Sequence, residues 1–137
     1  MRNIKFRGRR LDNKKWVFGY LVPVVSNGQT QMYIVSEVKD GAIQGFAVEP
    51  ESVAQFTGMC DRCGNEVYEG DIVRFRTTDE RYTRNPRFST LIVHYEERSA
   101  RFMAAGEIYW DTLRPEKVEV VGNSYDNPNV IHSIKYV

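Results

Sequence analysis

The chain has 137 residues, of which 42% are hydrophobic, and a formal net charge of only +1. This length suits one domain, or one barrel with a small added β layer. The near-zero charge excludes the strong overall field of a basic nucleic-acid or membrane binder, and no apolar run approaches the roughly 18 residues of a membrane span. Seven Phe, eight Tyr and two Trp favour sheets over a helical bundle.

Cysteine content and the N-terminal segment indicate the compartment. Two cysteines are too few for a disulfide framework. The basic segment 1–10 lacks the apolar stretch of a secretory signal. We therefore expect a soluble, cytoplasmic protein.

Charge is distributed unevenly along the chain. Residues 1–15 carry seven Lys or Arg against one acid, residues 16–74 carry three against eight, and residues 75–137 carry nine of each. The first segment alternates apolar residues with Lys5, Arg7 and Arg9, which predicts a strand with one basic face.

A hairpin is predicted over residues 4–22. Residues 11–15 form its turn, and Trp16, Phe18, Tyr20 and Val22 share one face of the return strand. Pro23 is expected to end the ladder because it has no N–H to donate. The next expected elements are a turn at 26–29, a short strand at 32–35, a turn at 39–41, extended chain at 42–48 and one helical turn at 49–53.

The stretch from Gln55 to Phe75 contains the most closely spaced strand and turn signals in the sequence. Its pattern predicts three strands separated by two turns. Gly58 interrupts the first strand, which suggests a bulge or a close approach of another backbone segment. Gly64 and Gly70 provide positive φ in the two turns, and Asp71 accepts from nearby backbone N–H groups. Closely spaced turns that each feed an apolar strand indicate a small, strongly bent barrel.

Motifs in this stretch and at both ends of the chain resemble those of the YopX-like family of small phage and prophage proteins. The matching segments are IKFR at 4–7, FTG at 56–58, GNEVYEGDIV at 64–73 and VVGNSYDNP at 120–128. The resemblance implies a mostly-β protein with an SH3-like barrel, made in a bacterial host and without an established activity. Its motif residues, taken as structural, are Phe56, Thr57, Gly58, Gly64, Tyr68, Glu69, Gly70, Asp71, Gly122, Asn123, Tyr125, Asn127 and Pro128.

The remaining pattern completes the predicted architecture. Residues 76–86 are expected to form a mobile loop, strands are expected at 90–95, 100–104 and 117–121, and the tail after a turn at 126–129 should pack back or add an edge strand. We predict an N-terminal β layer over residues 1–51 and an SH3-like barrel with a C-terminal tail over 52–137; the alternative is one compact unit. The predicted core includes Trp16, Phe56, Val73, Phe75, Val93 and Val120.

Cys60 and Cys63 form the sharpest chemical motif, because two thiolates at this spacing can bind one metal ion. A closed zinc site needs two more ligands, and the only histidines, His94 and His132, are far apart in the sequence. These two positions are usually polar in the family, so the resemblance implies nothing about thiols. We therefore expect two reduced cysteines on a turn, with no metal and no cofactor.

No enzyme signature is present in the sequence. The carboxylates of Glu66, Glu69 and Asp71 cluster, but no nucleophile or ligand set accompanies them, so turn formation explains them better. P-loop, G-x-G-x-x-G, G-x-S-x-G and H-E-x-x-H motifs are absent. We expect a protein that is not an enzyme, without a small-molecule substrate and with no membrane association.

The basic N-terminal segment is the predicted contact surface. A basic groove beside aromatic residues is typical of proteins that bind single-stranded nucleic acid, whereas a charged edge strand that prevents aggregation shows the same alternation. An acidic segment follows directly, so we expect either homo-oligomerisation or interaction with a host or phage protein. The alternative is nucleic-acid binding. The candidate contact residues are Lys5, Arg7, Arg9, Arg10, Lys14 and Lys15.

Overall fold

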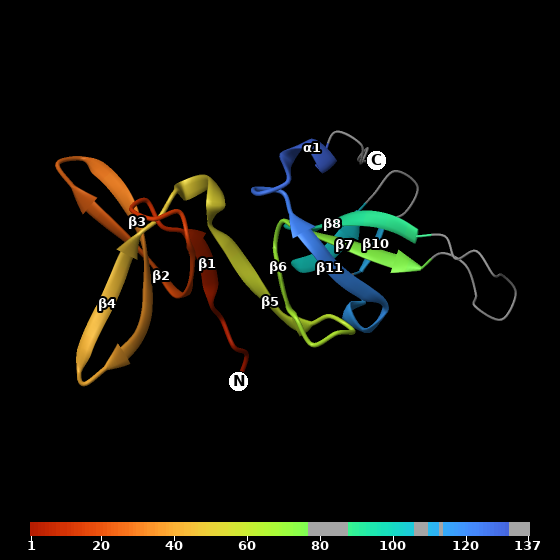
Figure 1. Ribbon diagram of the computed structural model, residues 1–137, viewed down its shortest axis with the longest axis horizontal. Coiled ribbons are helices and arrows are strands. Elements are labelled where there is room, and N and C mark those ends of the chain that lie inside the picture. The colour runs from red at the N-terminus through yellow and green to blue at the C-terminus, as the bar shows by residue number, and fades with distance from the viewer. Residues whose placement is uncertain (77–87, 106–109, 113, 132–137) are drawn as a thin grey trace, which may run out of the picture. The chain divides into compact units, whose positions relative to one another are not determined.

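Two antiparallel sheets dominate the structure, a computed structural model that describes residues 1–76, 88–105, 110–112 and 114–131 (Figure 1). The predicted mostly-β class is confirmed. The chain divides into two compact units, Met1–Phe56 and Thr57–Val137. The division falls inside one continuous strand, whereas the sequence placed a boundary between residues 51 and 52. The predicted loop at 76–86 lies almost entirely outside the described residues.

The first unit is a curled antiparallel sheet followed by one short helical turn. Its elements are β1 (Phe6–Arg9), β2 (Trp16–Ser26), β3 (Gln29–Lys39), β4 (Ala42–Ala47), the 3-10 turn η1 (Pro50–Ser52) and the start of β5 (Ala54–Cys60). Neighbouring strands follow the order β4-β3-β2-β1-β5. A bridge between Arg10 and Val48 joins the chain just after β1 to the chain just after β4.

Two tight turns fix the register of this sheet. Asn27 and Gly28 have φ angles of 51° and 76°, and Asp40 and Gly41 have φ angles of 55° and 76°. Positive φ at both central residues matches the twist of the flanking strands, which is why Asn-Gly and Asp-Gly are preferred in such hairpins. Both turns stand where the sequence predicts them.

Pro23 does not end the ladder, so that prediction is wrong. β2 continues to Ser26, and Pro23 lies opposite Met32 of β3. Within β2, β1 pairs only with Trp16–Gly19, so the outer half of β2 has β3 as its one neighbour in the described sheet. A proline is tolerated there because its nitrogen can face the edge where no ladder bond is required.

Backbone and side chains pack closely where the first sheet curls. A Cβ on Gly8 would lie 2.9 Å from the Cβ of Val48, and a Cβ on Gly19 would lie 2.1 Å from the carbonyl oxygen of Val35. Val48 and Ile34 are fully buried in this unit. Glycine at these two positions therefore lets the strands approach each other.

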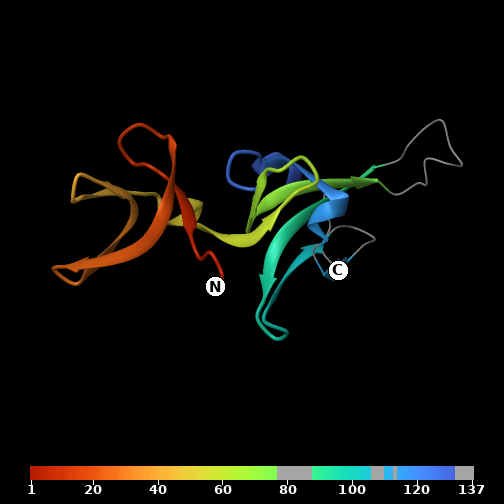
Figure 2. The ribbon, with the colours of Figure 1, turned by 90° about the horizontal axis from the view of Figure 1, so that it is seen from below.

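The second unit contains a five-stranded sheet in the order β10-β9-β8-β7-β11. Its elements are the end of β5, β6 (Glu66–Tyr68), β7 (Asp71–Arg76), β8 (Phe88–Glu96), β9 (Arg101–Ala105), β10 (Trp110–Thr112), the 3-10 turn η2 (Pro115–Lys117), β11 (Val118–Asn123) and α1 (Pro128–Ile131). Figure 2 shows β8 and β9, in green-blue, as a bent hairpin. In the described residues no pairing joins β10 to β11, so the sheet is open, and a three-residue β10 offers few groups for a further ladder.

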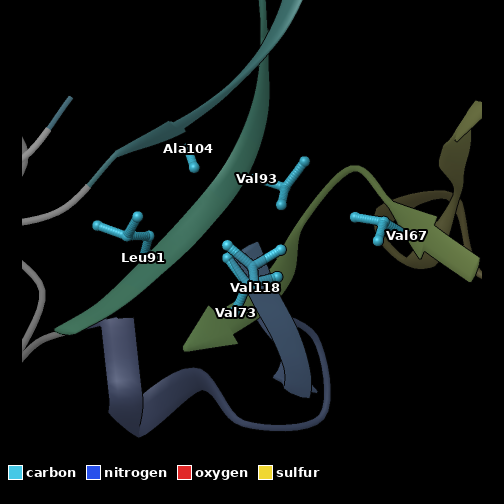
Figure 3. Close-up of a cluster of buried hydrophobic side chains, with 6 residues drawn as sticks. All are labelled: Val67, Val73, Leu91, Val93, Ala104 and Val118. Atoms are coloured by element: carbon cyan, nitrogen blue, oxygen red, sulfur yellow. The ribbon is translucent and has the colours of Figure 1, made fainter. Parts of the chain in front are cut away.

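The core of the second unit is formed by side chains of β6, β7, β8, β9 and β11, and Figure 3 shows its buried members. Its buried members are Val67, Val73, Leu91, Val93, Ala104 and Val118. Phe75 and Val120 pack against this cluster but stay partly exposed, because Val120 stands on β11 at the end of the sheet order and next to a register shift. Burial is thus confirmed for Phe56, Val73 and Val93, whereas Trp16, Phe75 and Val120 are only partly buried.

The chain after β11 turns back onto the sheet. Pro128 begins the short helix α1, and Val130 packs against the buried Ile72 and Ile92. The expectation that this segment packs back is confirmed for Val130. An added edge strand is not formed at residues 128–131, because Pro128 starts a helical turn, where its missing N–H costs no hydrogen bond.

Candidate functional site

The predicted basic face is formed by β1, where Arg7 and Arg9 extend from the same side of the strand. Arg7 lies opposite Phe18 and Arg9 lies opposite Trp16 in the β1–β2 register. The guanidinium carbons of Arg7 and Arg9 lie 4.9 Å and 5.5 Å from the centre of a Trp16 ring. Such cation–π contacts are worth about 0.5–1 kcal/mol at exposed sites, so both arginines help to hold Trp16 in place.

Lys5 and Arg10 also cover aromatic rings. The Lys5 Nζ lies 5.0 Å from the ring centre of Phe56, and the Arg10 guanidinium carbon lies 4.0 Å from that of Phe46. Arg10 donates two hydrogen bonds to the Asp12 carboxylate, at 2.9 Å and 2.6 Å. The hydrogen bond from Arg10 holds the pKa of Asp12 below its ordinary value.

The two remaining candidates, Lys14 and Lys15, lie in the turn between β1 and β2. The Lys14 ammonium forms an ion pair with Glu49, and the Lys15 N–H donates to the Asn13 side chain at 3.0 Å. The structure therefore places Arg7 and Arg9 on β1, with Lys5 directly before it, and gathers the other three around the following turn. Most of these cations already contact rings or carboxylates of their own unit.

The structure exposes a row of apolar side chains on β2, within the face that the sequence identified. Tyr20 is 66% exposed, and its neighbours on the same face, Phe18, Val22 and Val24, are exposed as well. On β4, Ile43 is 71% exposed. The sequence signal was the strict alternation of apolar residues, which identified the shared face but did not show whether another layer covers it.

The central family motif is a backbone clamp. The Asp71 carboxylate accepts the Tyr68 N–H at 2.7 Å, and the Tyr68 hydroxyl donates to Glu66 at 2.8 Å. Gly70, at φ 82°, donates its N–H to the Val93 carbonyl at 2.7 Å. Its Cα is approached so closely that an added Cβ would lie 2.9 Å from the Ser124 hydroxyl. These contacts give the motif a structural role.

The structure places the closing motif directly beside the central one. The Ser124 N–H donates to the Gly70 carbonyl at 2.8 Å, and Asn123 pairs with Asp71 across β11 and β7. The Asn127 side chain accepts the Asn123 N–H at 3.2 Å and fills the space that a Cβ on Gly122 would need. Family residues that are far apart in the sequence therefore form one junction.

The other motif residues support the same unit from its first strand. The Thr57 hydroxyl donates to the Val67 carbonyl at 2.7 Å, which joins β5 to β6. Gly64 has a positive φ angle, as predicted, and Gly58 has one as well. Glu69 and Tyr125 are partly buried, and Pro128 is the first residue of α1.

The turn with Cys60 and Cys63 is organised by a carboxylate rather than by sulfur. Asp61 is buried, and its side chain accepts the N–H groups of Cys63, Asn65 and Val120 at 2.8–2.9 Å. Burial raises the pKa of Asp61, but the hydrogen bonds from Val120, Asn65 and Cys63 lower it more, so the net pKa lies below its ordinary value.

Both thiols are free and exposed. Within the part of the chain that the structure describes, no three or more His, Cys, Asp or Glu side chains are grouped to hold a metal ion. His94 is a partly buried strand residue on β8, and His132 lies outside the described residues. The sequence prediction of a metal-free protein therefore remains a prediction.

Glu119 on β11 joins two arginines of the second unit. Its carboxylate accepts from Arg74 at 2.9 Å and from Arg62 at 3.3 Å, and the Arg74 bond lowers the pKa of Glu119. Arg74 also lies over the Phe88 ring, 4.7 Å from its centre. This partly exposed cluster resembles ordinary surface ion pairs, which contribute little to stability.

The two sheets and the junction of the two motifs define a mostly-β protein in which the motif residues hold the turns in place. The chain belongs to the YopX protein family, which it matches over residues 5–132. This confirms the resemblance inferred from the motifs. No curated protein matches the chain significantly.

Comparison with solved structures identifies a protein with a similar fold. The crystal structure of protein EF1440 from Enterococcus faecalis is similar with a TM-score of 0.52 and 20% sequence identity, over 96% of this chain and 99% of that one. At this identity the similarity concerns the fold alone. Among the described helices, none has the length and apolar character needed to cross a membrane.

Proposed function

We propose that this protein is a non-enzymatic interaction module of phage or prophage origin, which works in the bacterial cytoplasm by binding another protein or a second copy of itself. The observation that carries the proposal is the exposed row of Phe18, Tyr20, Val22 and Val24 on β2. Single exposed apolar residues are common on protein surfaces, but a contiguous patch marks an interaction site.

The row has the composition and spacing of a protein interface. Residues two apart on a strand are about 7 Å apart and point to the same side, so these side chains form a continuous strip. Aromatic residues such as Phe18 and Tyr20 are enriched at interface centres, where charged residues are depleted. The strip contains two aromatic and two aliphatic residues and no charge.

The arrangement of the basic strand supports a protein partner over nucleic acid. Arg7, Arg9 and Arg10 lie over aromatic rings, and Arg10 and Lys14 also pair with carboxylates. Cations that already have partners release less counterion from a phosphate backbone than free ones do. Catalysis is not part of the proposal, because the carboxylates of Asp61, Glu66 and Asp71 accept hydrogen bonds that hold local structure.

Nucleic-acid binding is the second candidate, and a specific observation favours it. Arg7 and Arg9 stand on the same strand face, opposite Phe18 and Trp16, and exposed Tyr20 follows on β2. Residues 1–56 carry eight Lys or Arg against five Asp or Glu. A cationic strand beside aromatic rings can hold a single strand by phosphate contacts and base stacking.

The SH3-like character of the second unit is also part of the proposal. Strands β7, β8, β9 and β10 follow one another as a meander, and β11 returns to lie beside β7. This order supports the small-barrel ancestry that the family resemblance implies. A measured structure with a ladder that closes the sheet would establish it.

Affinity capture from nuclease-treated bacterial lysate tests the protein-binding proposal. The bait is the full chain, and the test variant is Tyr20→Glu/Val22→Glu, which places two charges in the strip. Val25→Glu is the matched control, since Val25 is 70% exposed on the same strand but alternates to its other side. We expect the double variant to lose the captured protein and the control to keep it. Equal capture by all three baits would overturn the proposal.

Gel shifts with single-stranded DNA and RNA at low and physiological salt test the second candidate function, nucleic-acid binding. Binding that weakens steeply with salt, and that Arg7→Glu/Arg9→Glu abolishes, would favour nucleic acid. Absence of any shift at low salt would exclude it.

A further inference from the structure

The outer edge of β4 is a second interaction surface, distinct from the strip on β2. β4 pairs with β3 on one side and stands at the end of the sheet order in the described part of the chain. In Figure 1, β4 likewise borders its sheet beyond β3. Its residues Ala42–Gly45 are exposed.

Hydrogen bonds at the end of β4 show which residues face outward. The Ala47 carbonyl accepts the Leu11 N–H at 3.0 Å, so Ala47 bonds away from β3, whereas the Val48 N–H donates back to Met32 of β3 at 3.0 Å. Bonding sides alternate along an antiparallel strand. Gly45 and Ile43 therefore direct their N–H and C=O groups away from β3, as Ala47 does.

The residues of this edge include neither a charge nor a proline that would oppose strand pairing. Exposed edges are normally blocked by Lys or other charges, by Pro or by a bulge. The sequence of β4 is AIQGFA, with no charge and no proline. The register shift between Ser36 and Lys39 of β3 lies opposite Ile43, so the extra residue belongs to the neighbouring strand and not to β4 itself.

We propose that β4 pairs with β4 of a second copy of this chain, antiparallel and across a twofold axis at Gln44, so that the two first-unit sheets become continuous. The inference rests on the proposed function and names its partner and its geometry. Outward-bonding residues must face each other, and the Ala47 carbonyl is already used by Leu11. A register centred on Gln44 uses both remaining outward-bonding residues of β4: Ile43 lies opposite Gly45 of the partner subunit, and Gln44 lies opposite the partner's Gln44.

Packing in this register favours a second copy. A Cβ on Gly45 would lie 3.7 Å from a Val35 methyl and 3.8 Å from the Tyr33 ring, so the surface above Gly45 is apolar and open. The 71% exposed side chain of Ile43 would cover this surface on the other subunit. Because a twofold axis brings like charges together, an uncharged edge suits self-pairing and offers no complementarity to a charged partner.

Sedimentation or light scattering of the purified full chain over a wide concentration range tests the proposal. We expect a dimer, and Ile43→Lys should raise the dimer Kd at least tenfold because it places two lysines at the joined edge. Val25→Lys is the matched control, with an equally exposed valine on another strand, and should dimerise as the wild type does. A wild type that stays monomeric, or a dimer that Ile43→Lys leaves unchanged, would overturn the proposal.

A disulfide test checks the register itself. In a Cys60→Ser/Cys63→Ser background, Gln44→Cys should form a covalent dimer under mild oxidation, because directly opposed residues of a non-hydrogen-bonded pair lie about 4.5 Å apart at Cα. Val25→Cys in the same background should stay monomeric on a non-reducing gel. Equal cross-linking of both variants, or of neither, would refute this register.

The two proposals fail independently. Lysate capture that depends on the β2 strip, together with a monomeric pure protein, would keep the proposed function and remove the β4 inference. A β4-dependent dimer that captures nothing would confirm the inference and restrict the function to self-association.

Discussion

The carboxylate of Asp61 accepts the N–H of Val120 at 2.9 Å, although the two residues are 59 positions apart. The same turn is held again when the Arg62 N–H donates to the Val118 carbonyl at 3.1 Å. The turn that follows β5 is thereby attached to β11. One buried carboxylate thus joins the central stretch of the chain to its closing segment.

Asp61→Ala should lower the free energy of unfolding by about 3 kcal/mol, because it leaves several backbone N–H groups without their charged acceptor. Urea denaturation measures this. Asp12→Ala is the control, since the pair of Asp12 with Arg10 is exposed to solvent and is expected to contribute far less to stability. Equal losses in the two variants would show that the hydrogen bonds of Asp61 do not stabilise the fold.

Stability should fall in acid partly through Asp61. Its folded pKa lies below the ordinary value of 3.8, so its stabilisation is complete above that value and is lost as pH falls through the lowered folded pKa. Asp61→Asn removes the titrating group, so its urea midpoint should change less between pH 5 and about pH 2–3 than that of the wild type. Parallel pH profiles for the two proteins would contradict the assignment.

Gly19→Ala should destabilise the first unit by at least about 2 kcal/mol, since the new methyl group overpacks a site bounded by backbone. An added Cβ would lie 2.1 Å from the Val35 carbonyl oxygen, which can move only with the strand. Val25→Ala is the control, because Val25 lies on the same strand and is 70% exposed. Thermal unfolding by circular dichroism compares them, and similar melting temperatures would show that β2 and β3 separate readily.

Phe56→Ala and Phe75→Ala should differ in cost. Phe56 is only 7% exposed, so its truncation should cost about 3–5 kcal/mol. Phe75 packs at the margin of the core, and its loss should cost about 1.5–3 kcal/mol. Guanidinium denaturation of both variants decides this, and a larger loss for Phe75 would reverse the assignment of the core.

Metal removal should leave the protein unchanged. Cys60 and Cys63 supply two thiols, and a closed zinc site needs four ligands. Metal analysis of protein purified without chelator, and its melting temperature before and after EDTA treatment, give the test. One zinc per chain, or per pair of chains, would contradict the expectation.

The sequence by itself determined the elements whose signals are local. Asn27-Gly28 and Asp40-Gly41 specify their hairpins because few other residue pairs adopt positive φ at both positions. The alternation of apolar residues similarly predicted the shared face of β2 and the buried Val73 and Val93. The sequence motifs also identified the family, which the match over residues 5–132 confirms.

Only the tertiary structure decided which predicted surfaces are covered. A period of two assigns Tyr20 and Val22 to one face, but burial depends on whether another layer packs there, and both are exposed. The same holds for Pro23, which continues a strand because β1 stops short of it. The contact between Asp61 and Val120, and the junction of Gly70 with Ser124, likewise arise from segments that meet only after folding, since pairing between distant residues leaves no mark in a single sequence.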